Sequence, residues 1–233
     1  MYSEHIAIGG VQCNIYATPR PRVLLVQPSA RHEQKDDGLC REAAEIERLC
    51  GCGFAMAAFD TVEWARALMP WHDDAVSRDE ETGRHAPDTL HFVLHELLPW
   101  MRARYGCLPC IIGGYSLGGL FALWAAAHTS EFGGVAAASP SLWIEGWTPY
   151  AQHHPTLAQC AYISLGDREA HCRNQRMQRI ADCVRTQHSM LRQQLGDSRT
   201  TLEWNKGGHF GDEAARTARA FAWCINNITN TLL

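Results

Sequence analysis

The sequence predicts an α/β fold in which helices cover both faces of a mostly parallel, eight-stranded sheet. Continuous apolar runs, which are typical of strands buried on both faces, alternate along the chain with segments of helical periodicity. A glycine-rich turn joins the fifth of these strands to the helix that follows it. This alternation favours parallel strands that are connected by crossover helices.

Composition and charge narrow the class of protein. The chain has 233 residues, of which 46% are hydrophobic and 20% are charged, and we expect residues 1–233 to form one globular domain without a large cap domain. The formal net charge is −4, so no basic surplus indicates nucleic-acid binding and no polybasic run indicates a membrane surface. Because the first residues lack the pattern of a signal peptide, we expect a cytoplasmic protein.

The first half of the chain is expected to begin with a hairpin. Short strands at 5–8 and 11–17 flank Gly9-Gly10, which supplies the turn. The next predicted elements are a strand at 23–27, a polar loop at 28–37, a helix at 39–50, a strand at 54–59 and a helix at 87–105. Residues 60–86 show little periodicity, and a connection of this length is usually functional. We expect it to cover part of a pocket.

A strand, a sharp turn and a helix are predicted around Ser116. An apolar run at 110–112 leads into Gly114-Tyr115-Ser116-Leu117-Gly118, and a helix-forming sequence follows from Leu120. These five residues fit the pattern G-x-S-x-G, in which the serine stands at the tip of a strained strand-to-helix turn. Glycine two positions before and after the serine removes side chains that would collide with the strand and the helix. Ser116 is therefore the candidate nucleophile.

Three further strands are predicted after this turn. The expected order is a strand at 133–138, an irregular segment at 146–158, a strand at 161–165, a helix at 174–195, a strand at 200–204 and a helix at 213–228. Eight strands with the turn after the fifth are the arrangement of the α/β-hydrolase fold. We expect its catalytic groups on loops at the carboxyl ends of the strands.

A serine nucleophile needs a base, and the base needs an acid that orients it. His209 is the candidate base, because it alone among 12 histidines lies in a glycine-rich loop between the last strand and the last helix. Two carboxylates, Asp167 and Glu169, follow the strand at 161–165. Glu169 is favoured, because hydrolases commonly place the acid three residues after the glycine that ends the strand. Asp167 is the second choice, and it would otherwise shape the turn.

The oxyanion of an acyl transfer needs two N–H donors. Leu117 N–H, at the start of the helix, is the first candidate. The second is expected after the strand at 23–27, where Pro28 has no N–H, so Ser29 is favoured and Ala30 comes next. We also expect aromatic side chains to line a substrate pocket. The candidates are Tyr115, Trp71, Trp143 and Phe210, with Trp147 close to the same predicted loops.

Two patterns that resemble metal or redox sites are interpreted as structural. Cys107 and Cys110 have C-x-x-C spacing, but a buried strand follows and no second pair completes a zinc site. His91 and His95 lie four residues apart on one predicted helix, without a third ligand. We expect no metal and no cofactor, and the 10 cysteines are expected to be reduced.

The motifs resemble those of the putative esterase family of α/β-hydrolases, which includes esterase D, feruloyl esterases and ferric-enterobactin esterases. The segments that carry the likeness are 96–100, 112–123, 138–143, 163–169 and 208–210. The likeness is closest to the siderophore-esterase branch. It implies hydrolysis of a carboxylic ester by Ser116 and His209, with Glu169 at the matching acid position.

The sequence thus predicts a serine hydrolase that cleaves a small-molecule ester through an acyl-enzyme on Ser116, with His209 as general base. Acyl transfer to another alcohol and hydrolysis of a thioester would use the same groups. The remaining alternative is a member of the fold that binds without catalysis. A large separation between His209 and Ser116 would favour that alternative.

Overall fold

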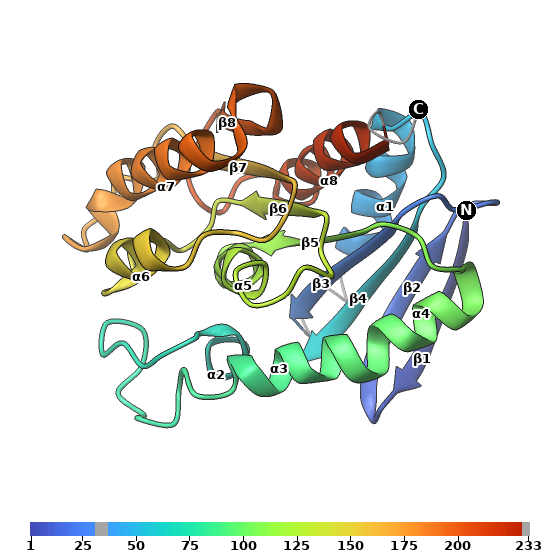
Figure 1. Ribbon diagram of the computed structural model, residues 1–233. Coiled ribbons are helices and arrows are strands. Elements are labelled where there is room, and N and C mark those ends of the chain that lie inside the picture. The colour runs from blue at the N-terminus through green and yellow to red at the C-terminus, as the bar shows by residue number, and fades with distance from the viewer. Residues whose placement is uncertain (31–36, 230–233) are drawn as a thin grey trace.

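A single eight-stranded sheet forms the centre of the computed structural model, which describes residues 1–30 and 37–229 (Figure 1). The strands are β1 Tyr2–Ile8, β2 Val11–Ala17, β3 Leu24–Ala30, β4 Ala55–Thr61, β5 Cys110–Tyr115, β6 Gly134–Ala138, β7 Cys160–Gly166 and β8 Thr200–Asn205. Their order across the sheet is β1-β2-β4-β3-β5-β6-β7-β8. The pairs β1–β2 and β2–β4 are antiparallel and all others are parallel. The predicted fold class is confirmed.

Helices connect the strands, and two of them lie in segments predicted to be irregular. The helices are α1 Gly38–Leu49, α2 Trp64–Leu68, α3 Ala86–Phe92, α4 Leu98–Tyr105, α5 Leu117–Ala125, α6 Trp147–His153, α7 Ile180–Leu195 and α8 Glu213–Thr229. The unexpected ones are α2 and α6. Pro149 made a helix there look unfavourable, but it stands in the first turn of α6, where a missing N–H is tolerated.

The helix predicted at 87–105 is interrupted by a π-helical turn, η1 Val93–Leu97, between α3 and α4. Pro99 explains the position of this turn. It has no N–H for the carbonyl of His95, and the backbone widens just before it. The helix predicted at 174–195 begins only at Ile180, after a short 3₁₀ turn, η2 Met177–Arg179. A second 3₁₀ turn, η3 Asp197–Arg199, precedes β8.

The core has two layers, one on each face of the sheet. Side chains of β3 alternate between them, with Leu24 and Val26 in one layer and Leu25 in the other. α1 and α8 pack in the second layer, whereas α3, α4 and α5 pack in the first. Figure 1 shows α1 and α8 on one side of the strands and α3 and α4 on the other.

Strand β3 extends beyond its predicted end at residue 27 and includes Pro28, Ser29 and Ala30. It pairs with β5 only over Leu24–Val26 and with β4 along its whole length. Pro28 is tolerated because one side of the strand has no neighbour at that point. The rest of the polar loop predicted at 28–37 lies mostly outside the described residues. No helix in the described ranges is long and apolar enough to cross a bilayer.

Candidate active site

The turn between β5 and α5 holds Ser116 in a strained conformation, with φ 56° and ψ −118°. The backbone around it is tied down. Ser116 N–H donates to the Ala138 carbonyl, and the Ser116 carbonyl accepts from the Ser141 N–H, both at 3.1 Å. A Cβ on Gly114 would come within 2.9 Å of the Gly118 carbonyl carbon. The pattern of glycines around the serine therefore reflects a real steric requirement.

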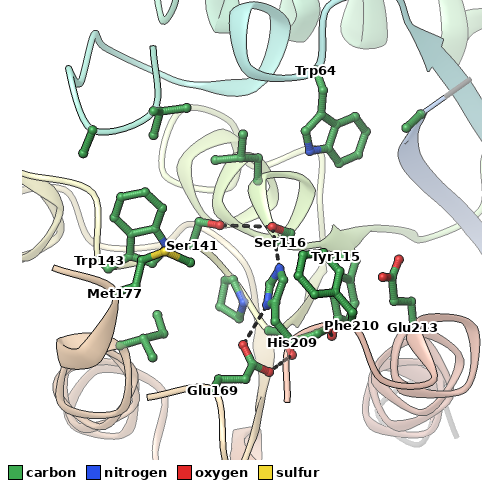
Figure 2. A pocket seen from close by; sticks show the side chains of 17 residues that line it. Trp64, Tyr115, Ser116, Ser141, Trp143, Glu169, Met177, His209, Phe210 and Glu213 are labelled. Carbon is green, nitrogen blue, oxygen red and sulfur yellow. Dashed lines mark hydrogen bonds and ion pairs between the residues drawn. The ribbon is translucent and has the colours of Figure 1, made fainter. Parts of the chain in front are cut away.

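A chain of hydrogen bonds joins Ser116, His209 and Glu169 (Figure 2). His209 Nε2 lies 3.0 Å from Ser116 Oγ, and His209 Nδ1 lies 2.7 Å from Glu169 Oε2. The three side chains come from the β5–α5 turn, the β8–α8 loop and the loop after β7. The structure thus brings together the nucleophile, base and acid candidates predicted from the sequence.

The carboxyl of Glu169 is buried and has a donor for each oxygen. Oε1 accepts from Ser139 Oγ and Gly166 N–H, both at 2.7 Å, and from Arg216 at 3.3 Å. Burial by itself raises the pKa of Glu169, but the hydrogen bonds from His209, Ser139 and Gly166 outweigh burial. The net effect is a pKa below the ordinary value for glutamate, which keeps an anion beside the imidazole.

Asp167, the second candidate acid, has a different position. Its Oδ1 accepts the Gly207 N–H at 2.8 Å, and its side chain is exposed. It therefore holds the loop that carries His209 against the end of β7. The two segments lie close together, because a Cβ on Gly166 would lie 2.4 Å from the Gly207 carbonyl oxygen. Geometry thus favours Glu169 as the group that orients His209.

Arg216, on α8, was not singled out by the sequence, yet it holds the His209 loop to the core. Its side chain is buried and donates to the carbonyls of Lys206 and Gly208 and to Tyr115 Oη, each at 3.0 Å. Tyr115 Oη in turn donates to the His209 carbonyl at 2.5 Å. An arginine in an amphipathic helix resembles a surface residue, so the sequence offers no signal for this role.

Ser116 and His209 open onto a cavity of about 450 Å³. Its other lining residues are mostly apolar: Ala30, Trp64, Ala75, Val76, Tyr115, Leu117, Ser139, Pro140, Ser141, Trp143, Glu169, Met177, Ile180, Phe210 and Glu213. Tyr115, Trp143 and Phe210 were predicted to line it. Trp64 was not, because it lies in the weakly periodic 60–86 segment. Met177 was not either, because it lies in a short turn that the sequence predicted as part of the following helix.

The prediction that Trp71 lines the same pocket is wrong. Its indole N–H donates to the Glu145 carbonyl at 2.8 Å. Its ring packs 6.2 Å from that of Trp147 and 5.1 Å from that of Tyr150. Trp147 itself is 1% exposed and belongs to the core. These two tryptophans therefore pack against each other and are not among the residues that line the cavity.

The structure agrees with one of the two candidate oxyanion donors, Leu117, and disagrees with the other, Ser29. Leu117 is the first residue of α5, a position whose N–H has no partner within the helix. Ser29 is fully buried within β3, its Oγ donates to the Phe59 carbonyl at 3.3 Å, and it does not line the cavity. Ala30, the second choice, does line it. The preference for Ser29 is corrected because β3 continues three residues further than the sequence suggested.

Comparison with known families decides the assignment. The family described as putative esterase matches residues 56–221, which include the β5–α5 turn, Ser116, Glu169 and His209. The chain belongs to the putative esterase family. The predicted family is therefore confirmed. Comparison with curated protein sequences gives no match.

Solved structures share the fold of this chain at low sequence identity. The enterobactin esterase FES from Shigella flexneri has a TM-score of 0.69 and 16% identity, over 100% of this chain and 60% of that one. The siderophore hydrolase EstA from Aspergillus nidulans has a TM-score of 0.70 and 17% identity, over 97% of this chain and 94% of that one. An IroE-like serine hydrolase from Shewanella oneidensis has a TM-score of 0.71 and 12% identity, over 97% of this chain and 79% of that one. The chain thus spans about three-fifths of the length of the Shigella enzyme.

An ion pair joins three segments at the rim of the cavity that Ser116 and His209 line. The Asp73 carboxyl is 1% exposed and accepts from Arg176 at 2.6 Å, from Glu145 N–H at 2.9 Å and from Ala75 N–H at 2.8 Å. Ala75 lines the cavity, as does Met177, which follows Arg176. Burial raises the pKa of Asp73, but these donors outweigh burial and lower it overall.

Asp73→Asn is expected to reduce the free energy of unfolding by about 1–3 kcal/mol at pH 7, because it removes charged hydrogen bonds from a buried site. KM should rise more than kcat falls, since the rim carries cavity-lining residues. The Asp73 pKa is lowered in the folded state, so its stabilisation is present above about pH 3.9 and is lost as the pH falls through the folded-state pKa. Urea unfolding of the wild-type and Asp73→Asn proteins at several pH values measures the free energy of unfolding. Steady-state kinetics of the same two proteins measure KM and kcat.

Asp74→Asn is the matched control, because the Asp74 side chain is 87% exposed and, among the described residues, its one hydrogen-bond partner is the His72 ring. Its effect should stay within about 0.5 kcal/mol. Equal destabilisation by the two variants would contradict the role of Asp73 at the rim.

The histidine pair and the cysteine pair noted in the sequence lie outside the site around Ser116. His91 and His95 stack with ring centroids 4.1 Å apart, and His95 Nδ1 donates to the His91 carbonyl. Cys107 is exposed, whereas Cys110 lies inside β5, where burial raises the pKa of its thiol to about 12. Within residues 1–30 and 37–229, no three His, Cys, Asp or Glu side chains are placed to hold a metal ion.

Proposed function

We propose that the protein hydrolyses carboxylic esters through an acyl-enzyme on Ser116. The observation that supports this most strongly is the continuous chain from Ser116 Oγ through His209 to Glu169, with contacts of 3.0 and 2.7 Å. These are the distances that a nucleophile, a general base and an orienting acid require. The cavity above Ser116 leaves room for a small-molecule ester.

Acylation begins when Ser116 Oγ attacks the carbonyl carbon of the ester. The hydroxyl proton passes to His209 Nε2, while Glu169 holds the proton on Nδ1 and stabilises the imidazolium that forms. Negative charge develops on the carbonyl oxygen, where the Leu117 N–H and a donor at Ala30 would stabilise it. When the tetrahedral intermediate collapses, the ester C–O bond breaks and the alcohol leaves with the proton from His209.

Deacylation repeats these steps with water. His209 takes a proton from a water molecule, whose oxygen attacks the acyl carbon. The bond between that carbon and Ser116 Oγ then breaks, and the proton returns to Ser116. The products are a carboxylic acid and an alcohol. Because another alcohol or a thioester can enter the same steps, acyl transfer and thioester hydrolysis remain the alternative reactions.

Steady-state hydrolysis of neutral aryl esters with graded acyl length tests the proposal, and siderophore esters belong in the same panel. We expect saturable release of acid and phenol. Adding a competing alcohol distinguishes transfer, which yields a new ester, from hydrolysis. A folded protein that turns over no ester in the panel would contradict the proposal and favour a binding role.

A further inference from the structure

The carboxylate of Glu213 faces the cavity without taking part in the chain of Ser116, His209 and Glu169. Glu213 is the first residue of α8 and lines the cavity (Figure 2). Its backbone carbonyl accepts from Thr217 Oγ1. Among the described residues, its carboxylate has no hydrogen-bond or ion-pair partner. A charge placed this way is available to a ligand.

Two aromatic side chains share the cavity lining with this carboxylate. A second cavity adjoins the first, and both are lined by Trp64, Tyr115 and Glu213. Figure 2 shows these three side chains on one side of Ser116, with Trp143 and Met177 on the other. A carboxylate and aromatic rings that line one cavity are a combination that binds alkylammonium groups, through charge attraction and cation–π contact.

The charged residues that the structure describes around this side of the site are mostly acidic. No lysine or arginine is among the described residues that line the first cavity. Of the residues in 1–30 and 37–229, the charged ones that line the second cavity are Arg41, Glu42, Asp212 and Glu213, of which three are acidic. The N-terminus of α8 contributes about half a positive charge, which is less than the charge of Asp212 and Glu213 together. Arg216 nearby is buried and paired with Glu169.

We propose that Glu213 and Trp64 form a subsite for a positively charged ammonium group on the ester substrate. The inference rests on the proposed ester hydrolysis, and it narrows the substrate class to esters with a cationic substituent. Esters with an anionic substituent should be disfavoured at this site by repulsion from Glu213.

The test compares kcat/KM for three esters of the same acid. They are the ester of choline, its neutral isostere in which carbon replaces the ammonium nitrogen, and an anionic sulfonate analogue. Glu213→Gln should lower the ratio of choline ester to neutral isostere by about three- to tenfold and raise that of the sulfonate ester. Higher salt should lower the choline ratio of the wild-type protein.

Glu47→Gln is the control, because it removes one negative charge from an exposed position on α1 that lines neither cavity. It should leave both ratios unchanged. The inference is overturned if Glu213→Gln leaves the choline ratio unchanged, or if Glu47→Gln shifts it equally, while the wild-type protein hydrolyses the neutral isostere. Failure of the wild-type protein to hydrolyse any of the three esters would instead overturn the proposed function.

Discussion

Ser116→Ala is expected to lower kcat for ester hydrolysis by about 10⁵- to 10⁶-fold, because the variant has no oxygen with which to form the acyl-enzyme. The fold should persist, since alanine keeps the Cβ that already occupies the strained turn at φ 56°. Steady-state kinetics measure the loss, and circular dichroism with thermal unfolding confirms that the variant is folded.

Ser141→Ala provides a control from the same cavity. Ser141 Oγ lies 3.2 Å from Ser116 Oγ, but the hydrogen bond of His209 Nε2 is to Ser116. Loss of one such hydrogen bond corresponds to about 1 kcal/mol, or roughly a fivefold effect on kcat. The double variant Ser116→Ala with His209→Ala should be no slower than Ser116→Ala alone, because the two groups act as one unit. Larger loss in Ser141→Ala than in Ser116→Ala would reassign the nucleophile.

Glu169→Gln is expected to lower kcat by about 10³- to 10⁴-fold. Three donors, from Ser139, Gly166 and Arg216, converge on Oε1, so the amide oxygen of glutamine must take that place. The amide NH₂ then faces His209 Nδ1, which has to accept a hydrogen bond. The imidazole proton is thereby moved to Nε2, where it blocks transfer from Ser116.

Asp167→Asn separates this effect from a general loss of carboxylate charge. Asp167 accepts one hydrogen bond, from Gly207 N–H, and an asparagine oxygen can accept it too. We expect kcat to change by less than about tenfold. A loss as large as that of Glu169→Gln would show that Asp167, or the loop it holds, orients His209 in place of Glu169. Kinetics of both variants on one neutral ester are sufficient.

The parts of the site that the sequence predicted are those with a local steric or chemical cause. Ser116 is identified by glycines that its turn requires, and His209 by the glycine-rich loop between a strand and a helix. Glu169 is identified by its spacing from Gly166, which ends β7. Each signal lies within a few residues of the group it identifies. The mostly parallel sheet was likewise predicted from a local signal, the alternation of buried strands and helices along the chain.

The remaining parts depend on contacts between distant segments. Trp71 and Trp64 lie in one weakly periodic segment, and only the packed structure shows that Trp64 lines the cavity, whereas Trp71 packs against Trp147. Arg216 is paired with Glu169, which is 47 residues away along the chain. Asp73 is 103 residues from Arg176. Such pairings leave no periodic pattern in a single sequence.

Intact-mass spectrometry after treatment with a fluorophosphonate tests most directly whether Ser116 is an activated nucleophile. The reagent labels a serine only when its hydroxyl is activated, and peptide mapping locates the label. We predict one adduct, on Ser116 of the wild-type protein, and none on the folded Ser116→Ala variant. A wild-type protein that remains unlabelled, or a label on another residue, would contradict the assignment of Ser116 as the nucleophile.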